Sequence, residues 1–341
     1  MRLLIAIAVS VVISMTGVRA QDIPPVPPLP PPPQPFAEWL ADLRTEALTR
    51  GIRPEIVDAA FADIAQPVDS ILERDRSQAE FTLALDAYLK RRLTPALVRT
   101  AQEMFTRQRT LLTTVGKKYG VSPRILVSVW GLESNFGRFA GVRPTIPALA
   151  TLAYDPRRGP FFRSELFSAL EILNRGDIEL TKLQGSWAGA LGQPQFMPSS
   201  YLQYAQDYDG DGRRDIWSSP PDVFASVAYF LKQHGWVDGL AWGREVLVPK
   251  AARAAVAQVP RREQGCRAER MMTLQRPLTE WKKRGVKGLG NRPLPSATTP
   301  ASLVAAGSRY FLVNGNYEAI LGYNCAHTYA LSVSLLSDRL K

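Results

Sequence analysis

Apolar residues recur at every third or fourth position along most of the chain between Phe36 and about Leu240. This spacing is typical of α-helices that bury one face, so the region is predicted to be a helical body. Pro54 and Pro123 each precede such a pattern, and proline is favoured in the first turn of a helix. Ser122, directly before Pro123, is a typical N-cap residue. Helices are predicted over residues 122–136, 162–173 and 221–231 among others.

The pattern changes after Gly243, where short β-branched runs and segments rich in Gly and Pro replace the helical spacing. Residues 314–316, Asn-Gly-Asn, separate two apolar runs, and this arrangement strongly favours a β-hairpin. Residues 326–340 return to helical spacing and predict a closing helix. The fold class is therefore predicted as mainly α (α+β), with a helical body over about 36–242 and a smaller α+β part over about 243–341.

The first twenty residues have the features of a secretory signal peptide, namely a positive start, an apolar stretch and small residues before a cleavage point after Ala20. Removal of residues 1–20 would leave the protein in the periplasm, and an uncleaved anchor is the alternative. No later run reaches about 18 apolar residues, so no membrane span is expected after signal removal. Residues 21–35 are rich in proline and are predicted to form a stiff linker. In an oxidising compartment Cys266 and Cys325 could pair, or both could remain free thiols.

Lys and Arg number 42 against 31 Asp and Glu, which gives a formal net charge of +11 and points to an anionic partner. A nucleic acid is not expected, because the sequence shows no basic stripe with interleaved aromatic residues. The chain has only two Cys and two His, which excludes a Cys/His zinc framework and a disulfide-dense scaffold. A Ser-His-Asp triad would have to use His234 or His327.

One carboxylate falls on the apolar face of a predicted helix. At about 100° per residue, Glu133 in the helix over 122–136 lies between Leu126 and Val129. Burial of a carboxylate is costly unless the group is paired or protonated, and a raised pKa is what a general acid needs at neutral pH. The alternative is a structural Glu133 that an Arg or backbone amides would satisfy.

The segment Gly185–Tyr201 combines glycines, which allow close backbone approach, with hydroxyl, amide and aromatic side chains. Ser186, Gln193 and Gln195 could form hydrogen bonds, and Trp187 offers a flat apolar face. Sugars need both kinds of contact, so the segment is a candidate carbohydrate-binding loop. The alternative is a tight turn before a helix that begins at Pro198.

Five blocks of distinctive sequence follow one another along the chain. They are Trp130–Gly137, Ala148–Leu152 with Pro156–Arg158, Gly185–Gly192, Gln195–Tyr201 and Asp207–Gly212. In this order they resemble the catalytic segment of the soluble and membrane-bound lytic transglycosylase B family, over most of residues 36–341. The resemblance implies a lysozyme-like helical catalytic core, an extra N-terminal helical region and a smaller α+β C-terminal part that folds back on the cleft.

The activity implied by the resemblance is cleavage of the β-1,4 bond between N-acetylmuramic acid and N-acetylglucosamine in peptidoglycan. Glu133 would protonate the glycosidic oxygen and then, as a carboxylate, take the proton of the muramyl C6 hydroxyl. That hydroxyl closes a 1,6-anhydro ring without water, and no cofactor is implied for catalysis. The expected partners are peptidoglycan glycan strands and other cell-wall enzymes.

The same resemblance carries substrate-binding roles to eight further residues. They are Ser186 and Gln195 as hydrogen-bonding groups, Phe196 as a wall of the cleft, Arg157 and Arg158 as a clamp for substrate carboxylates, and Tyr88, Tyr323 and Asn324 as further parts of the cleft.

Two alternatives to a lytic transglycosylase are a hydrolytic muramidase and a catalytically silent cell-wall-binding protein. Hydrolysis usually needs two carboxylates. The nearest other acids in the sequence are expected to be structural, with Asp155 beside Arg157 and Arg158. Glu165 is expected on a charged helix face.

A run of aspartates resembles a calcium loop. Positions 1, 3, 5, 6 and 9 of an EF-hand are matched by Asp207, Asp209, Asp211, Gly212 and Asp215. Position 12 is Ser218 rather than Glu, so the bidentate ligand is missing or displaced to Asp222. The predicted ligands of a structural Ca²⁺ are Asp207, Asp209, Asp211, Arg213, Asp215 and Asp222. The alternative is an aspartate-rich surface turn without an ion.

Overall fold

The structure is a computed structural model that describes residues 34–76, 85–295 and 297–340. The chain divides into two units, Met1–Pro35 and Phe36–Lys341, and almost all of the described residues belong to the second. The predicted signal peptide, and the predicted linker except for its last two residues, lie outside the described residues. Within the described ranges, none of the helices is both long and apolar enough to cross a membrane.

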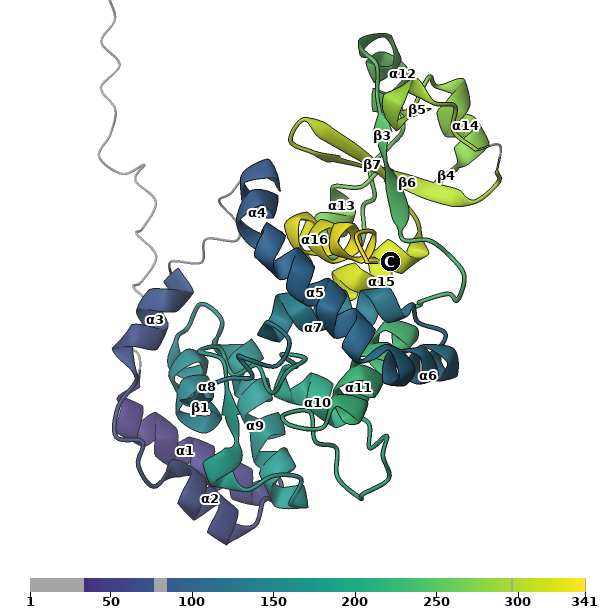
Figure 1. The fold of residues 1–341 in the computed structure, drawn as a ribbon. Coiled ribbons are helices and arrows are strands. Elements are labelled where there is room, and N and C mark those ends of the chain that lie inside the picture. Colours follow the sequence, from purple (N-terminus) through teal and green to yellow (C-terminus); the bar gives the residue numbers. More distant parts are fainter. Residues whose placement is uncertain (1–33, 77–84, 296, 341) are drawn as a thin grey trace, which may run out of the picture. The chain divides into compact units, whose positions relative to one another are not determined.

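The second unit is mainly helical, as predicted (Figure 1). Its helices are α1 (Phe36–Thr49), α2 (Pro54–Phe61), α3 (Asp69–Arg76), α4 (Leu85–Arg92), α5 (Pro95–Arg107), α6 (Arg109–Tyr119), α7 (Pro123–Ser134), α8 (Thr145–Tyr154), α9 (Gly159–Arg175), α10 (Pro198–Tyr204), α11 (Pro220–Gln233), α12 (Arg253–Ala257), α13 (Arg267–Arg270), α14 (Leu278–Lys283), α15 (Gly315–Tyr323) and α16 (His327–Ser337). Its strands are β1 (Arg143–Pro144), β2 (Gln184–Gly185), β3 (Gly243–Leu247), β4 (Arg276–Pro277), β5 (Lys287–Gly288), β6 (Pro300–Ala306) and β7 (Arg309–Val313).

Helix α7 is the central helix of the body, because it packs against α5, α6, α11 and α16. Almost every residue from Ile125 to Ser134 is buried, so the helix has no wide polar face. It begins with Ser122 as N-cap and Pro123 in the first turn, as predicted. It ends at Ser134, two residues before the predicted end at residue 136, and its C-cap Asn135 takes the left-handed conformation with φ 49°.

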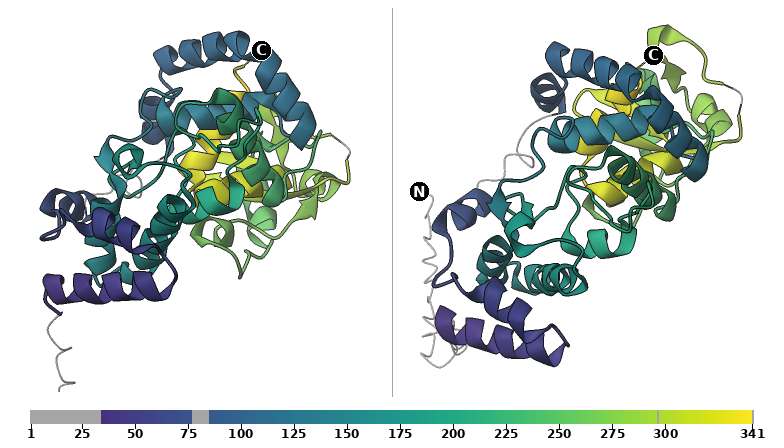
Figure 2. Two further views of the ribbon diagram at one scale, coloured as in Figure 1. Left: turned by 90° about the horizontal axis from the view of Figure 1, so that it is seen from below. Right: turned by 60° about the horizontal axis from the view of Figure 1, so that its bottom comes forward.

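The N-terminal helices pack against the middle of the chain. Helix α2 contacts α1, α8 and α9, and α3 contacts α8. Figures 1 and 2 show α1 and α2, drawn in purple, beside the teal helices α8 and α9 in every view. Leu43 of α1 and Phe61 of α2 are buried in the main core that also contains α7. This arrangement agrees with an extra helical region attached to a helical core.

A five-stranded antiparallel sheet lies in the C-terminal part, with strand order β4-β6-β7-β3-β5. Strands β6 and β7 form a hairpin around Gly307, whose φ of 64° suits a tight turn. Trp281 of α14 is fully buried in a second hydrophobic cluster that includes Val246 and Leu312 of this sheet. The sheet therefore has a small core of its own.

The predicted hairpin at residues 314–316 is wrong. Asn314 has φ −106° and precedes α15, so the two apolar runs become a strand and a helix. Asn316 is fully buried and its amide Nδ2 donates to the carbonyls of Val237 (2.9 Å) and Leu240 (2.6 Å). Its Oδ1 accepts from the Val237 amide at 2.7 Å. These long-range hydrogen bonds, which no local pattern encodes, favour the buried helix over an exposed turn.

Cys266 and Cys325 form a disulfide, so the paired alternative of the sequence analysis is confirmed. The bond joins the start of α13 to the segment between α15 and α16. Helix α16 packs against α4, α7 and α15. The end of the chain therefore contributes to the helical body rather than to the sheet.

Candidate active site

Glu133 lies in the last turn of α7 and is half-buried, whereas its neighbours Leu132 and Ser134 are buried. Three successive residues with positive φ follow, namely Asn135 (49°), Phe136 (60°) and Gly137 (80°). Positive φ is unfavourable for residues other than glycine, so the surrounding contacts must hold this turn in place. The strained turn reverses the chain directly after Glu133.

Two tyrosines of the C-terminal helices, the buried Tyr329 and the half-buried Tyr323, lie within electrostatic reach of the same carboxylate. Burial raises the pKa of Tyr329 well above its ordinary value, and the nearby charge of Glu133 raises it further. Burial, followed by the charge of Glu133, likewise raises the pKa of Tyr323. Both hydroxyls therefore stay protonated at neutral pH and can donate. The buried hydroxyl of Tyr329 has no hydrogen-bond partner among the described residues.

The end of α7 also has a cationic neighbour. Arg92, the last residue of α4, donates from Nη2 to the carbonyl of Leu132 at 2.7 Å. This carbonyl lies at the C-terminal end of the helix, where its partners within the helix run out. The charge of Arg92 reaches the site, since it acts to lower the pKa of Tyr329.

The Gly185–Tyr201 segment begins with a tight turn that the Ser186 side chain organises. Its Oγ accepts from the amides of Ala188 (3.3 Å) and Ala190 (3.1 Å). An oxygen that accepts two hydrogen bonds still has its own proton to donate. Ser186 is half-buried, so this proton is within reach of a ligand. Gln195, also half-buried, has φ 55° and donates from Nε2 to the Gly192 carbonyl at 2.8 Å.

Phe196, the predicted wall of the cleft, lies mostly inside the protein, and its contact with substrate stays a prediction. It is only 2% exposed and packs against the rings of Tyr204, Phe230 and Tyr323. The Tyr323 hydroxyl donates to the carbonyl of Pro194 at 2.7 Å. Phe196 therefore joins the loop to α15 from inside the core, and Tyr323 links the same loop to the region of Glu133.

Arg157 and Arg158 both meet acids within the protein. Asp75 of α3, whose side chain is only 4% exposed, lies 2.8 Å from Nη2 of Arg157 and 3.1 Å from Nη1 of Arg158. Asp155 pairs with Arg157, as predicted, and this hydrogen bond holds the pKa of Asp155 below its ordinary value. The two arginines are about half-exposed, and their role as a substrate clamp stays a prediction.

Glu165 is not on a charged helix face, contrary to expectation. It is 4% exposed, and its carboxylate accepts from the amide (2.9 Å) and the hydroxyl (2.7 Å) of Ser199. These bonds satisfy donors in the first turn of α10. Glu165 is therefore a structural acid that joins α9 to α10.

Tyr88 and Asn324 occupy different environments. Tyr88 is buried on α4, a helix that packs against α16. Asn324 is exposed and directly follows α15. The structure places both on elements next to the Glu133 region, and their contacts with substrate stay predictions.

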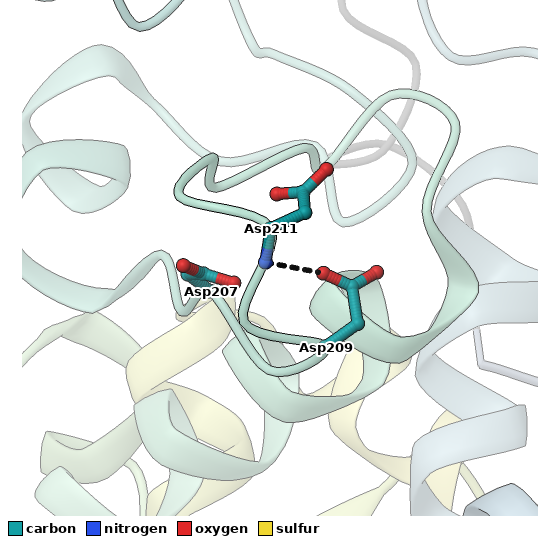
Figure 3. A group of neighbouring side chains, drawn as sticks. All are labelled: Asp207, Asp209 and Asp211. Carbon is teal, nitrogen blue, oxygen red and sulfur yellow. Dashed lines mark hydrogen bonds between the residues drawn. The ribbon is translucent and has the colours of Figure 1, made fainter.

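The aspartate-rich loop brings three of the predicted ligands together. One carboxylate oxygen from each of Asp207, Asp209 and Asp211 lies within 4.8 Å of the others, and all three residues are exposed. Figure 3 shows them on one loop, with the Asp211 amide donating to Asp209. Asp207 accepts from the amides of Gly210 (2.7 Å) and Gly212 (3.0 Å). Carboxylate oxygens suit a hard cation such as Ca²⁺, which takes six to eight oxygen ligands.

Asp215 and Asp222 lie outside this cluster, and their role as calcium ligands stays a prediction. The two oxygens of Asp222 accept from the amides of Tyr208 and Asp215, both at 2.8 Å, and Asp222 is fully buried. Asp215 accepts from the amides of Trp217 (2.9 Å) and Ser218 (2.8 Å). The structure therefore uses these two acids to fold the loop.

Sequence reasoning missed Tyr329 altogether and did not predict the partners of Gln193. Tyr329 lies in a closing helix whose pattern shows only that it is apolar. Gln193 was noted as a polar residue of the loop, but its partners Trp130 and Trp217 are 63 and 24 residues away. Contacts over such separations leave no local pattern by which they could be found.

Comparisons with known proteins agree with this geometry. The family described as "Transglycosylase SLT domain" matches residues 35–338. Membrane-bound lytic murein transglycosylase B of Escherichia coli (strain K12) is 32% identical over 286 residues, which are 79% of this chain and 73% of that protein.

Solved structures are similar over the same region. SltB3 from Pseudomonas aeruginosa, in complex with NAG-anhNAM-pentapeptide, is 42% identical with a TM-score of 0.80, covering 89% of this chain and 79% of that one. Escherichia coli Slt35 in complex with calcium is 28% identical with a TM-score of 0.72, covering 89% and 92%. From the match over residues 35–338 and these relatives, we conclude that the chain belongs to the transglycosylase SLT domain family.

Proposed function

We propose that this protein is a peptidoglycan lytic transglycosylase in which Glu133 acts first as general acid and then as general base. The observation that carries the proposal is the half-buried Glu133 at the end of α7, beside the buried hydroxyl of Tyr329. The relative SltB3 was solved with a fragment whose name contains an anhydromuramyl unit. Family membership and this geometry support the same reaction.

In the first step Glu133 gives its proton to the glycosidic oxygen, and the bond from that oxygen to C1 of the muramyl sugar breaks. Glu133 lies in the last turn of α7, where the helix dipole disfavours a negative charge and so favours the protonated acid. Charge of oxocarbenium type develops on the sugar ring. The donating hydroxyl of Tyr329 can stabilise the carboxylate that forms.

In the second step the muramyl C6 hydroxyl attacks C1 and its proton passes to Glu133, which restores the acid. Intramolecular attack of this kind can gain an effective molarity of about 10⁵ M or more. A hydrolase would need a second carboxylate to position water. The nearest acids in the sequence are engaged elsewhere, since Asp155 pairs with Arg157 and Glu165 binds Ser199. This supports the anhydro product over hydrolysis.

The remaining assignments belong to the same proposal. Ser186 and Gln195 bind the substrate by hydrogen bonds, with Tyr88, Tyr323 and Asn324 completing the cleft, and Arg157 and Arg158 meet substrate carboxylates. Asp207, Asp209 and Asp211 hold a structural Ca²⁺, with the backbone carbonyl of Arg213 as the position 7 ligand of the loop. The protein acts in the periplasm after loss of residues 1–20, on glycan strands and alongside other cell-wall enzymes.

The product tests the proposal. Purified sacculi digested in H₂¹⁸O should release muropeptides that end in 1,6-anhydromuramic acid, resist borohydride reduction and contain no ¹⁸O. Glu133→Gln should fold normally and lose activity by at least about 10³-fold, because both acid and base roles disappear. A reducible muramyl end that carries ¹⁸O would instead identify a hydrolytic muramidase. Full turnover by Glu133→Gln would contradict the assignment of Glu133.

A further inference from the structure

Gln193 joins the helix of Glu133 to the loop of Ser186. Its side-chain Oε1 accepts from the indole Nε1 of Trp130 at 2.7 Å, and its Nε2 donates to the Trp217 carbonyl at 2.8 Å. Its backbone amide donates to the Ile216 carbonyl at 2.9 Å. Gln193 is 8% exposed and Trp130 is 5% exposed, so solvent cannot easily replace these bonds.

The Trp130 end of this link is close to the catalytic group in the chain. Trp130 precedes Glu133 by about one turn of α7, and its ring packs at right angles against those of Phe136 and Phe224. Phe136 belongs to the strained turn after Glu133. A shift of the Trp130 ring would therefore move both the last turn of α7 and the turn that follows it.

Gln193 also contacts the strained turn directly. A Cβ atom built on Gly137 would lie 2.6 Å from Gln193 Oε1, so any side chain at this position would require the Gln193 amide group to move. Gly137 in turn donates its amide to the Ser134 hydroxyl at 3.0 Å. The Gln193 amide group thus lies against the helix and the turn on either side of Glu133 in the sequence.

We propose that Gln193 is a positioning residue, which acts through Trp130 to fix the carboxyl of Glu133 relative to Ser186 and Gln195. The inference rests on the proposed role of Glu133 and assigns no substrate contact to Gln193. Proton transfer requires the acid to lie within hydrogen-bonding reach of the glycosidic oxygen. A displacement of about 1 Å can cost about 10²-fold in rate. A rigid link between the end of α7, which carries Glu133, and the loop of Ser186 and Gln195 therefore has a direct kinetic effect.

The test compares kcat and KM of Gln193→Met, Trp130→Phe and the double variant on a soluble GlcNAc–MurNAc tetrasaccharide with stem peptides. Each single variant removes the bond between Oε1 and the indole. We expect kcat to fall about 10- to 10²-fold with KM changed less than about twofold. Because both variants remove the same hydrogen bond, the loss of kcat in the double variant should be little greater than that in the less active of the two single variants.

Trp281→Phe is the matched control. Trp281 is a fully buried tryptophan in the second hydrophobic cluster, and its indole donates to the Ala301 carbonyl at 2.9 Å. The substitution removes a buried indole hydrogen bond of the same kind, so the melting temperature should fall as it does for Trp130→Phe. Its kcat should stay at the wild-type value.

Unchanged kcat in Gln193→Met and Trp130→Phe would overturn the positioning role, and so would multiplicative losses in the double variant. A similar loss of kcat in Trp281→Phe would show that stability alone explains the effect. Glu133→Gln is measured in parallel. If it is inactive while the link variants are fully active, only the role of Gln193 fails; if it is active, the proposed function fails as well.

Discussion

Glu133 and the aspartates of the 207–218 loop are all acidic, but the fold surrounds them differently. Glu133 is half-buried at the end of a buried helix, and its nearest described partners include tyrosines from other helices. Asp207, Asp209 and Asp211 are exposed, and Asp207 and Asp211 accept hydrogen bonds from amides of their own loop. The first environment is assembled from distant segments, and the second is almost entirely local.

The two environments indicate different roles, one in the reaction and one in the stability of the fold. Partial burial separates the Glu133 carboxyl from bulk water, which is the usual setting of a group in acid and base catalysis. Exposed carboxylate oxygens that lie close together suit a hard cation such as Ca²⁺. We therefore expect changes around Glu133 to affect the rate and changes in the loop to affect stability.

The largest effect that distinguishes the two regions is expected from Tyr329→Phe. Loss of the hydroxyl that interacts with Glu133 should lower kcat by about 10²-fold, as when one donor to a charged group in an active site is removed. Tyr317→Phe is the control, since burial alone raises the pKa of Tyr317 and its hydroxyl lies 3.0 Å from Nδ1 of His327. Equal kcat values for both variants would show that the Tyr329 hydroxyl has no role in the reaction.

Calcium should produce the next effect, and only on stability. At about 100 times the dissociation constant, Ca²⁺ should stabilise the wild type by about 2.7 kcal/mol, and this shift in melting temperature should disappear in Asp207→Ala. Activity should persist in chelator, because the proposed reaction needs no metal. Coincident melting curves in chelator and in excess calcium would contradict calcium binding, and the loop would then be only a turn.

The smallest effect should come from the acids that fold the loop. Asp222→Asn replaces one acceptor oxygen with a donor that faces a backbone amide, and we expect a loss of about 1–3 kcal/mol in the free energy of unfolding without calcium. Burial raises the pKa of Asp222, which agrees with its position in the interior. The exposed Asp211→Asn should change stability by less than about 0.5 kcal/mol under the same conditions. Urea denaturation of both variants measures the difference, and equal losses would contradict the division into folding acids and ligands.

Local patterns predicted most of the helical body. The apolar spacing and the Ser122–Pro123 start located α7, and Pro54 located the start of α2. These signals are reliable because capping and helical periodicity depend on residues only three or four apart. The same spacing placed Glu133 on a costly apolar position before any partner was known.

The sequence-based predictions failed where contacts with a distant segment determine the local structure or the burial of a residue. Residues 314–316 carry a hairpin sequence, but Asn316 is drawn into hydrogen bonds with Val237 and Leu240. Glu165 has no local sign of burial, and Ser199 becomes its partner only when α9 and α10 pack. Phe196 is an aromatic residue in a polar loop, and α10, α11 and α15 enclose it.

The sequence by itself determined the mainly helical class, the position of Glu133 on an apolar helix face and the clustering of aspartates in one loop, because periodicity and residue spacing are properties of neighbouring residues. Tertiary structure alone decided which groups surround Glu133. Tyr329 comes near Glu133 only when α16 packs against α7, and Gln193 contacts Trp130 of the same helix only when the 185–196 loop lies against it. Hydrogen bonds between residues far apart in the chain depend on the packing of whole elements, and no short pattern specifies that packing.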